Sequence, residues 1–272
     1  MVMKRSRFVS KHNVGHALLI AGSKGMMGAA VLAAKAALHT GTGLVSVLSA
    51  ACGEKILQTS VPEALFIADE QDSHISDIVL NRTYSAIAVG PGLGRHEETA
   101  RAFYKLLGQI KRPIVLDADA LNLLAGHTEL IENLPKNTIL TPHHLEFDRL
   151  FGKNDTSYER LNKAREIAIR YHIIIVLKGA NTAIVTPKGD VLFNSSGNAG
   201  MATAGSGDTL TGMITGLLAQ GYHPIPAAIL GVFLHGTAGD LAAERDSQEY
   251  ITAGDIISQI GQAYKKLHNY RV

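Results

Sequence analysis

Residues 198–213 read Asn-Ala-Gly-Met-Ala-Thr-Ala-Gly-Ser-Gly-Asp-Thr-Leu-Thr-Gly-Met, and this run of small residues leads into a helix predicted over 207–220. Unobstructed backbone N–H groups at the start of a helix, together with the helix dipole, form an anion site. Phosphate is the natural ligand of such a site. No Gly-Lys-Ser/Thr follows the glycines, which distinguishes the segment from a Walker loop. The segment therefore predicts a phosphate-binding helix start of another kind.

Asp208 lies at the start of this predicted helix. Aspartate is favoured at helix N-caps and in first turns, so its position alone is also consistent with a capping role. The glycines around Asp208 favour a catalytic role, and the helix dipole would keep its carboxylate ionised. A carboxylate beside bound phosphate is tolerable if it serves as a base or if Mg²⁺ bridges the charges.

The rest of the chain alternates short apolar runs with helical stretches. The apolar runs predict buried strands at 17–21, 44–48, 86–89, 114–116, 138–140 and 173–177, followed by an edge hairpin of 183–186 and 191–193. Helices are predicted at 27–40, 96–109, 119–125, 143–151, 156–171, 207–220, 224–244 and 253–268. Continuously apolar strands that alternate with helices indicate an α/β layered fold with a mostly parallel sheet.

Glycine-rich or polar turns follow five of the predicted strands. They occupy 22–29, 90–94, 117–120, 141–146 and 178–182. A glycine after one strand usually marks only a turn. In open α/β sheets, however, ligands bind beyond the carboxyl ends of the strands, and five such turns in succession predict one shared pocket.

Composition narrows the class of protein. The chain has 272 residues, of which 46% are hydrophobic and 18% charged, with a net charge of +2, no Trp and one cysteine, Cys52. These values exclude intrinsic disorder, and they disfavour a nucleic-acid partner. A lone cysteine excludes an internal disulfide and a cysteine-cluster metal site. We expect a single domain over 1–272 with a solvated basic arm at about 1–14. No run of 18 apolar residues predicts a membrane helix, so a cytoplasmic location is the default expectation.

The helix predicted at 27–40 is apolar almost all round. Lys35 and His39 are its polar positions, and they share one stripe because they are four residues apart. Such a helix is buried on most sides. A sheet together with an oligomer neighbour would bury it, and the apolar helix at 224–244 also suggests association.

Taken in order, the segments 21–30, 90–92, 117–121, 141–146, 178–179 and 198–208 resemble the ribokinase-like superfamily, and within it the ADP/ATP-dependent NAD(P)H-hydrate dehydratases. The resemblance spans about residues 15–265. It implies a ribokinase-like three-layer fold. It also implies repair of hydrated NADH and NADPH: the 6-hydroxyl is phosphorylated at the expense of ADP or ATP, and phosphate is then eliminated. With ADP the products are NAD(P)H, AMP and phosphate.

The same resemblance implies roles for individual residues. Asp208 would deprotonate the 6-hydroxyl, and an anion hole would comprise Gly205, Ser206 and Gly207. The nucleotide would be contacted by Lys178, Gly179, Ala180, Asn181, Thr182, Asn198, Gly200 and Gly207. The hydrated dinucleotide would be contacted by Ala29, Gly92, His143 and Asp208. Mg²⁺ would bridge the phosphates with few protein ligands, and Glu146 is a candidate ligand through water.

The resemblance also extends to assembly and partners. It suggests a homotetramer and a preference for ADP. A separate NAD(P)H-hydrate epimerase would have to interconvert the hydrate epimers.

Two departures from the family pattern stand out. The family commonly has Gly-Gly-Thr-Gly-Asp where this chain has Ala204-Gly205-Ser206-Gly207-Asp208, a change that keeps the hydroxyl and both glycines next to the aspartate. The family usually has Thr-Pro-His-Pro-Gly-Glu, whereas His144-Leu145 replace Pro-Gly here. The second change predicts a different path for this loop and puts the roles of His143 and Glu146 in question.

Several other polar residues have simpler interpretations. His143 is equally consistent with capping the helix that follows Pro142. Asp117 and Asp119 are both consistent with helix-start caps, and this interpretation is preferred for Asp119. His235, within an apolar helix, is interpreted as a core or interface histidine, and Cys52 as a small buried residue.

Two rival functions remain at this point. A kinase of the same superfamily acting on a vitamin precursor, such as a hydroxyethylthiazole kinase, would share the fold and Asp208. A catalytically inactive nucleotide-binding module would bind ADP or ATP without turnover. A kinase accumulates a phosphorylated alcohol, whereas the dehydratase releases free phosphate.

Overall fold

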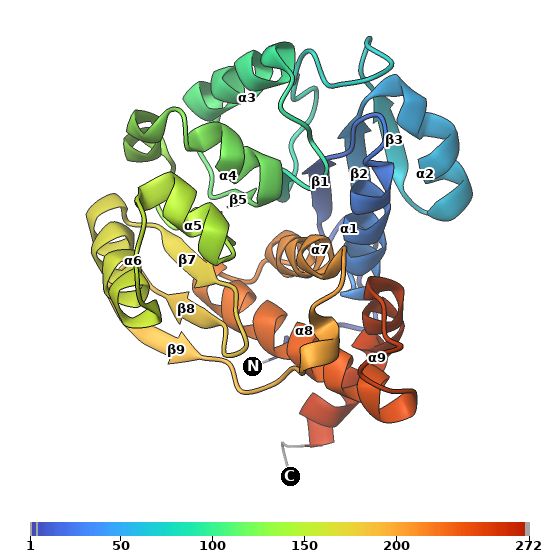
Figure 1. Cartoon of the computed structure of the whole chain (residues 1–272). Helices are drawn as coiled ribbons and strands as arrows, with labels where there is room; N and C mark the ends of the chain where they lie inside the picture. The colour runs from blue at the N-terminus through green and yellow to red at the C-terminus, as the bar shows by residue number, and fades with distance from the viewer. Residues whose placement is uncertain (1, 4, 270–272) are drawn as a thin grey trace.

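One nine-stranded sheet organises the computed structural model, which describes residues 2–3 and 5–269 (Figure 1). The strands lie in the order β3 (Leu65–Ala68), β2 (Leu44–Ser49), β1 (His16–Ile20), β4 (Ala86–Val89), β5 (Val115–Leu116), β6 (Ile139–Leu140), β7 (Ile174–Leu177), β8 (Ala183–Val185) and β9 (Val191–Phe193). Neighbours from β3 to β7 pair in parallel, and β8 and β9 add an antiparallel edge. The carboxyl ends of β1 to β7 therefore face one edge of the molecule.

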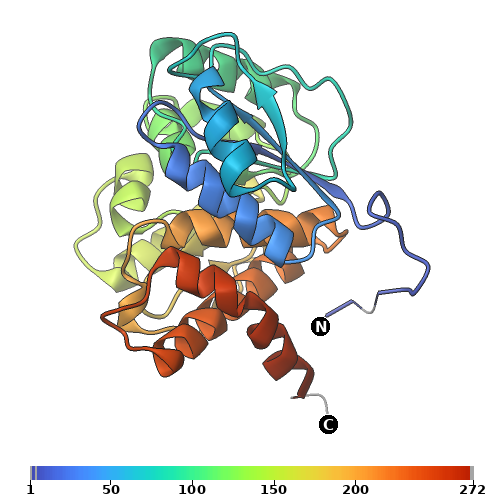
Figure 2. The same cartoon turned by 90° about the vertical axis from the view of Figure 1, so that its right-hand side faces the viewer.

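Helices cover both faces of the sheet, as the predicted three-layer fold requires. One face carries α3 (Glu97–Gln109), α4 (Ala118–Leu124), α5 (His144–Phe151) and α6 (Ser157–Tyr171). The other carries α1 (Met27–His39), α2 (Glu54–Ser60), α7 (Ser206–Ala219) and α8 (Pro224–Arg245). α9 (Ala253–Asn269) packs on α8, α7 and α1 in an outer tier (Figure 2). Three short 3₁₀ helices occupy Ala51–Gly53, Thr128–Asn133 and Ala199–Met201.

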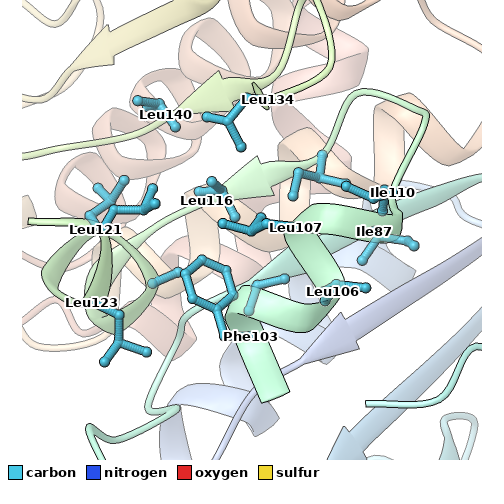
Figure 3. Close-up of a cluster of buried hydrophobic side chains, with 14 of the residues drawn as sticks. Ile87, Phe103, Leu106, Leu107, Ile110, Leu116, Leu121, Leu123, Leu134 and Leu140 are labelled. Carbon is cyan, nitrogen blue, oxygen red and sulfur yellow. The ribbon is translucent and has the colours of Figure 1, made fainter. Parts of the chain in front are cut away.

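A leucine- and isoleucine-rich core fills the space between the sheet and α3 to α6 (Figure 3). Phe103 from α3 and Leu121 from α4 meet Leu116 of β5 there, and all three are fully buried. Each such side chain contributes about 1.5–3 kcal/mol through burial. This core fixes the register of β5, and with it the position of the polar turn that follows.

α1 is buried on most sides, as predicted, but by its own chain. Its buried alanines contact the sheet, α7 and α9. A methyl group at Gly212 of α7 would overlap the carbonyl oxygen of Ala33, so the two helix backbones approach as closely as glycine allows. An oligomer neighbour is therefore not needed to explain why α1 is so apolar.

The predicted elements are confirmed, with their ends displaced by a residue or so, but α2 and β3 were missed. β3 lies at the sheet edge, and its Leu65 is 45% exposed. An edge strand of four residues with exposed apolar side chains carries little of the pattern that marks a buried strand.

α8 is long and apolar enough to be considered as a membrane span by length and composition, although no uninterrupted apolar run of that length occurs. Its most apolar window is 67% buried inside the molecule, between α7 and α9. This burial is typical of a core helix.

Most of the described residues in the basic arm predicted at 1–14 are exposed, as expected for a solvated segment, but Met3 and Arg5 contact the rest of the protein. The Met3 amide donates to the Tyr222 hydroxyl at 2.7 Å. The Arg5 guanidinium donates to Gly41 O and, at 3.0 Å, to Gln220 Oε1. The guanidinium satisfies carbonyl groups where α1 and α7 end, which local sequence does not reveal. Residues 1 and 4 lie outside the described residues.

Candidate active site

The polar turns that follow β1, β4, β5, β6 and β7 meet at the carboxyl edge of the sheet, next to the start of α7. Backbone bonds join neighbouring turns: Gly22 N donates to Pro91 O at 2.9 Å, and Lys178 N donates to Pro142 O at 2.9 Å. Surface hollows of about 530 and 260 Å³ lie elsewhere, one between α1 and α9 and the other beside 82–87 and 109–114. The candidate site is therefore identified by its converging chemical groups.

Lys178 and Asp117 form the ionic centre of this edge. The Lys178 ammonium lies 2.8 Å from Asp117 Oδ1, and the Thr211 hydroxyl of α7 donates to Asp117 Oδ2 at 2.7 Å. The Asp117 side chain is 1% exposed and that of Lys178 is 19% exposed. Burial alone would lower the pKa of Lys178, but the carboxylates of Asp117 and Glu146 outweigh it and raise that pKa. Lys178 is thus held as a cation that remains accessible to an anionic ligand.

Asp117 and Asp119 do not cap α4, contrary to expectation. Asp117 occupies the N-cap position, but its side chain makes no capping bond because both oxygens are engaged by Lys178 and Thr211. Asp119 Oδ2 accepts from Gly94 N at 3.0 Å and thereby ties α4 to the turn after β4.

The start of α7 faces this ion pair. Gly205 is the N-cap residue and has a φ of +86°, a conformation that favours glycine. A methyl group at Gly207 would lie 3.2 Å from Lys178 Nζ and 3.9 Å from Asp117 Oδ2. The first amides of a helix lack partners within the helix, so here they lie beside a buried cation. An anion held by these amides would also meet Lys178.

Asp208 occupies the first turn of α7 and is half-buried. Burial, and then the negative charge of Asp117, raise its pKa to about 6, although Lys178 opposes this rise. Its carboxylate makes no hydrogen bond with the residues that the structure describes. A carboxylate with this pKa and an unused lone pair is suited to accept a proton near neutral pH.

His143 and Glu146 form a capping box at the start of α5. His143 Nδ1 accepts from Leu145 N at 3.1 Å, and Glu146 Oε2 accepts from His143 N at 2.9 Å. The capping interpretation of His143 is therefore confirmed. Glu146 is buried, which raises its pKa, and its Oε2 lies 3.9 Å from Lys178 Nζ. The capping box keeps His143 and Glu146 together at the ionic centre even though His144-Leu145 replace Pro-Gly.

Ala29 and Gly92, two of the residues expected at the dinucleotide, are neighbours. A methyl group at Gly92 would lie 3.0 Å from Ala29 Cβ. The Ser23 hydroxyl donates to Gly92 O at 2.9 Å, which fixes the turn after β4 against the turn after β1. These contacts form what we call the rim, defined by Ser23, Ala29 and Gly92.

The residues expected at the nucleotide divide into two groups. Gly179, Ala180 and Asn181 are exposed in the loop between β7 and β8, adjacent to Lys178. Asn198 instead uses its side chain within the protein: Oδ1 accepts from Gly200 N at 3.0 Å and Nδ2 donates to Asp240 Oδ1 at 3.0 Å. Asn198 thus shapes the segment that leads to α7.

The sequence alone does not indicate that Asp117 and Thr211 belong to the ionic centre. The position of Asp117 at a strand exit was the available signal, but its partners lie 61 and 94 positions away. His235 is buried as expected, and burial lowers its pKa to about 4, so its imidazole is neutral beside the Ser206 hydroxyl at 3.4 Å. Cys52 is half-buried, so it is less enclosed than expected.

Known proteins are similar to this chain in sequence and in fold. A family model for NAD(P)H-hydrate dehydratase matches residues 17–262. The chain belongs to the NAD(P)H-hydrate dehydratase family. Within this family, the chain is 39% identical to the ADP-dependent (S)-NAD(P)H-hydrate dehydratase of Neisseria meningitidis, over 95% of this chain and 86% of that protein.

Solved structures of relatives confirm the ribokinase-like fold. The ADP/ATP-dependent NAD(P)H-hydrate dehydratase from Bacillus subtilis, co-crystallized with ATP/Mg²⁺, matches with a TM-score of 0.86 at 33% identity, covering 97% of this chain and 94% of that one. A ribokinase-like superfamily protein from Enterococcus faecalis matches with a TM-score of 0.82 at 26% identity, covering 97% and 92%. Other curated members of the dehydratase family are bifunctional NAD(P)H-hydrate repair enzymes, and the chain spans about half their length.

Proposed function

We propose that this protein is an ADP-dependent (S)-NAD(P)H-hydrate dehydratase that restores hydrated NADH and NADPH. The observation that carries the proposal is the convergence of Asp208, the first amides of α7 and the Lys178–Asp117 pair at one edge of the sheet. The names of relatives that match this chain over most of both lengths support the same activity.

The proposed reaction has two steps. The oxygen of the 6-hydroxyl attacks the β-phosphorus of ADP, the bond to the bridging oxygen breaks, and AMP leaves. The hydroxyl proton goes to the Asp208 carboxylate. The C6–O bond then breaks with loss of phosphate, C5 loses a proton, and the C5–C6 double bond reforms. Phosphate leaves far more readily than hydroxide, which is why a nucleotide is consumed.

The chain's own groups fit the charge that develops during transfer. The amides of Gly205, Ser206 and Gly207 are proposed as the anion hole, where fixed donors stabilise the migrating phosphoryl group. Lys178 lies beside Gly207 and is proposed to neutralise the nucleotide phosphates, with the exposed loop 179–182 contacting the nucleotide. The rim at Ala29 and Gly92, together with His143, is proposed to hold the hydrated dinucleotide.

Mg²⁺ would neutralise phosphate charge in this site. Hard cations prefer oxygen ligands, and Mg²⁺ commonly uses one or two carboxylates together with substrate phosphates and water. Glu146 would contribute through water, since one of its oxygens already accepts from His143 N.

Several finer properties are proposed on family likeness alone. We propose that residues 1–272 act as one domain with a preference for ADP, in the cytoplasm, as a homotetramer. An NAD(P)H-hydrate epimerase activity is proposed as the functional partner, since curated relatives are named bifunctional NAD(P)H-hydrate repair enzymes. Light scattering of the purified protein tests the tetramer.

The decisive experiment combines the protein with hydrated NADH, ADP and Mg²⁺ and follows the return of reduced-nicotinamide absorbance. Leaving out ADP should abolish the signal, and free phosphate should appear in equal amount. Asp208→Asn should lower turnover by ~100-fold or more while nucleotide binding persists, because a positioned base is lost. A stable phosphorylated product would instead identify a small-molecule kinase, and nucleotide binding without turnover would identify an inactive module.

A further inference from the structure

We propose that His74, His96 and Glu98 bind one divalent transition-metal cation of the Zn²⁺ class, at a site that shares no side chain with the candidate active site. One potential ligand atom from each side chain lies within 4.8 Å of the others. His74 Nε2 lies 2.8 Å from Glu98 Oε2, and the two imidazole rings stack with centroids 3.7 Å apart. Among the residues that the structure describes, His74, His96 and Glu98 are the one group of three potential metal ligands that lie this close together.

The donor set selects the class of cation. Imidazole nitrogen suits Zn²⁺ and its transition-metal neighbours, whereas Mg²⁺ and Ca²⁺ prefer oxygen ligands throughout. Two imidazoles and one carboxylate also leave a fourth tetrahedral position for water. This site would therefore take a different ion from the one that accompanies a nucleotide.

The protein holds His74 in place before any cation arrives, and His74 in turn contacts Glu98. Ser73 Oγ lies 3.0 Å from His74 Nδ1, which leaves His74 Nε2 directed at Glu98. The Asp69 carboxylate accepts bonds from the Ser76 amide and hydroxyl, at 2.9 and 2.8 Å, and so organises the loop around His74. The His74 side chain is 13% exposed, so few other rotamers are open to it.

His96 supplies the adjustable ligand. It is exposed at the N-cap of α3, where its Nδ1 accepts from Glu98 N across 3.3 Å, a long bond. Ligand atoms of a tetrahedral zinc site lie about 3.4 Å apart, given metal–ligand distances near 2.1 Å. Rotation of the exposed His96 ring would bring its ligand atom to that separation from the other two ligand atoms. The long capping bond from Glu98 N to His96 Nδ1 would then be lost.

A bound cation would join two segments that are far apart in sequence. His74 lies in the connection between β3 and β4, whereas His96 and Glu98 begin α3. Ser73 O accepts from Lys24 N at 2.9 Å, in the turn that leads to Ala29. The cation would therefore fasten this connection beside the rim.

The test uses the full chain, stripped with a chelator and dialysed against Zn²⁺, with bound metal measured by mass spectrometry. One Zn²⁺ per chain should be retained in the presence of excess Mg²⁺. His96→Asn removes the imidazole but keeps a good N-cap, so it should fold normally and bind Zn²⁺ at least ~100-fold more weakly. His74→Gln should behave likewise.

His127→Gln is the matched control, since His127 pairs with Glu129 at 3.1 Å on the surface without a third described ligand. It should retain Zn²⁺ like the parent protein. Hydrogen exchange across 69–85 should slow when Zn²⁺ is added to the parent but not to His96→Asn. Equal Zn²⁺ binding by the parent and His96→Asn, or an equal loss in His127→Gln, would overturn the proposal.

Discussion

Replacing Asp208 with Asn should make the protein more stable while it destroys activity. Burial and neighbouring acids raise the pKa of Asp208 from an ordinary 3.8 to about 6, so the folded protein holds this charge at a cost. Each unit of pKa corresponds to about 1.4 kcal/mol, which sets an upper bound of about 3 kcal/mol. Because the side chain is half-buried and partly screened, we expect the Asn variant to gain about 1–3 kcal/mol at pH 7.5.

The sign of the effect depends on pH. The folded protein binds a proton at Asp208 more tightly than the unfolded chain does, so the parent loses stability as pH rises from about 4 to about 6. Below pH 4 both states are protonated, and the advantage of the Asn variant should disappear. For a protein of this size about 2 °C of melting temperature accompanies each kcal/mol, so a rise of about 2–6 °C is expected at pH 7.5.

Thermal and urea unfolding of the parent and of Asp208→Asn, at pH 7.5 and pH 4, measure this difference. Thr209→Ser, a conservative change at the next position of α7, is the control and should show no pH-dependent difference from the parent. An Asn variant that is less stable than the parent at pH 7.5 would refute the reasoning. A stability gain that persists unchanged at pH 4 would do the same.

Three further outcomes follow from the site. Lys178→Met should cost about 3–5 kcal/mol of unfolding free energy because it strands the buried Asp117, and adding Asp117→Asn should recover part of that loss in urea titrations. Gly205→Ala should lower stability by about 1–3 kcal/mol and turnover more than ~10-fold because φ is +86°, whereas Gly179→Ala, with open space around it, should change the melting temperature little. Gly92→Ala, with a φ of +58° at the rim, should raise KM for the hydrated dinucleotide but not for ADP; equal rises in steady-state kinetics would argue against its assigned place.

The parts of the fold that sequence predicts are those with a strong local pattern. β4 was predicted with its observed bounds because Ala86–Val89 is buried on both faces and reads as an uninterrupted apolar run. β3, which is as long as β4, was missed because it lies at the sheet edge and both of its end residues are exposed. Burial on both faces, rather than strand propensity, makes a strand visible in a sequence of this kind.

For the candidate site, the sequence predicts which turns contribute residues. It does not predict which side chains from different turns bond to one another. The sequence indicates Asp208 as a site residue because it begins a glycine-rich helix. It indicates Lys178 because this residue directly follows an apolar strand. For Asp117, local preference is consistent with a helix cap and indicates no other role. Its bonds to Lys178 and Thr211 arise only when β5, β7 and α7 meet in three dimensions. Bonds between residues this far apart in sequence produce no local sequence pattern from which they could be predicted.

The close backbone approach of α7 to α1 has a consequence for motion during turnover. Since a glycine of one helix rests on a carbonyl of the other, with no side chain between them, the pair has little freedom to slide or tilt. The start of α7, which we propose to bind phosphate, is therefore expected to stay fixed relative to α1. Any movement that admits the proposed dinucleotide is therefore expected in the polar turns at the carboxyl edge of the sheet rather than in the α1–α7 pair.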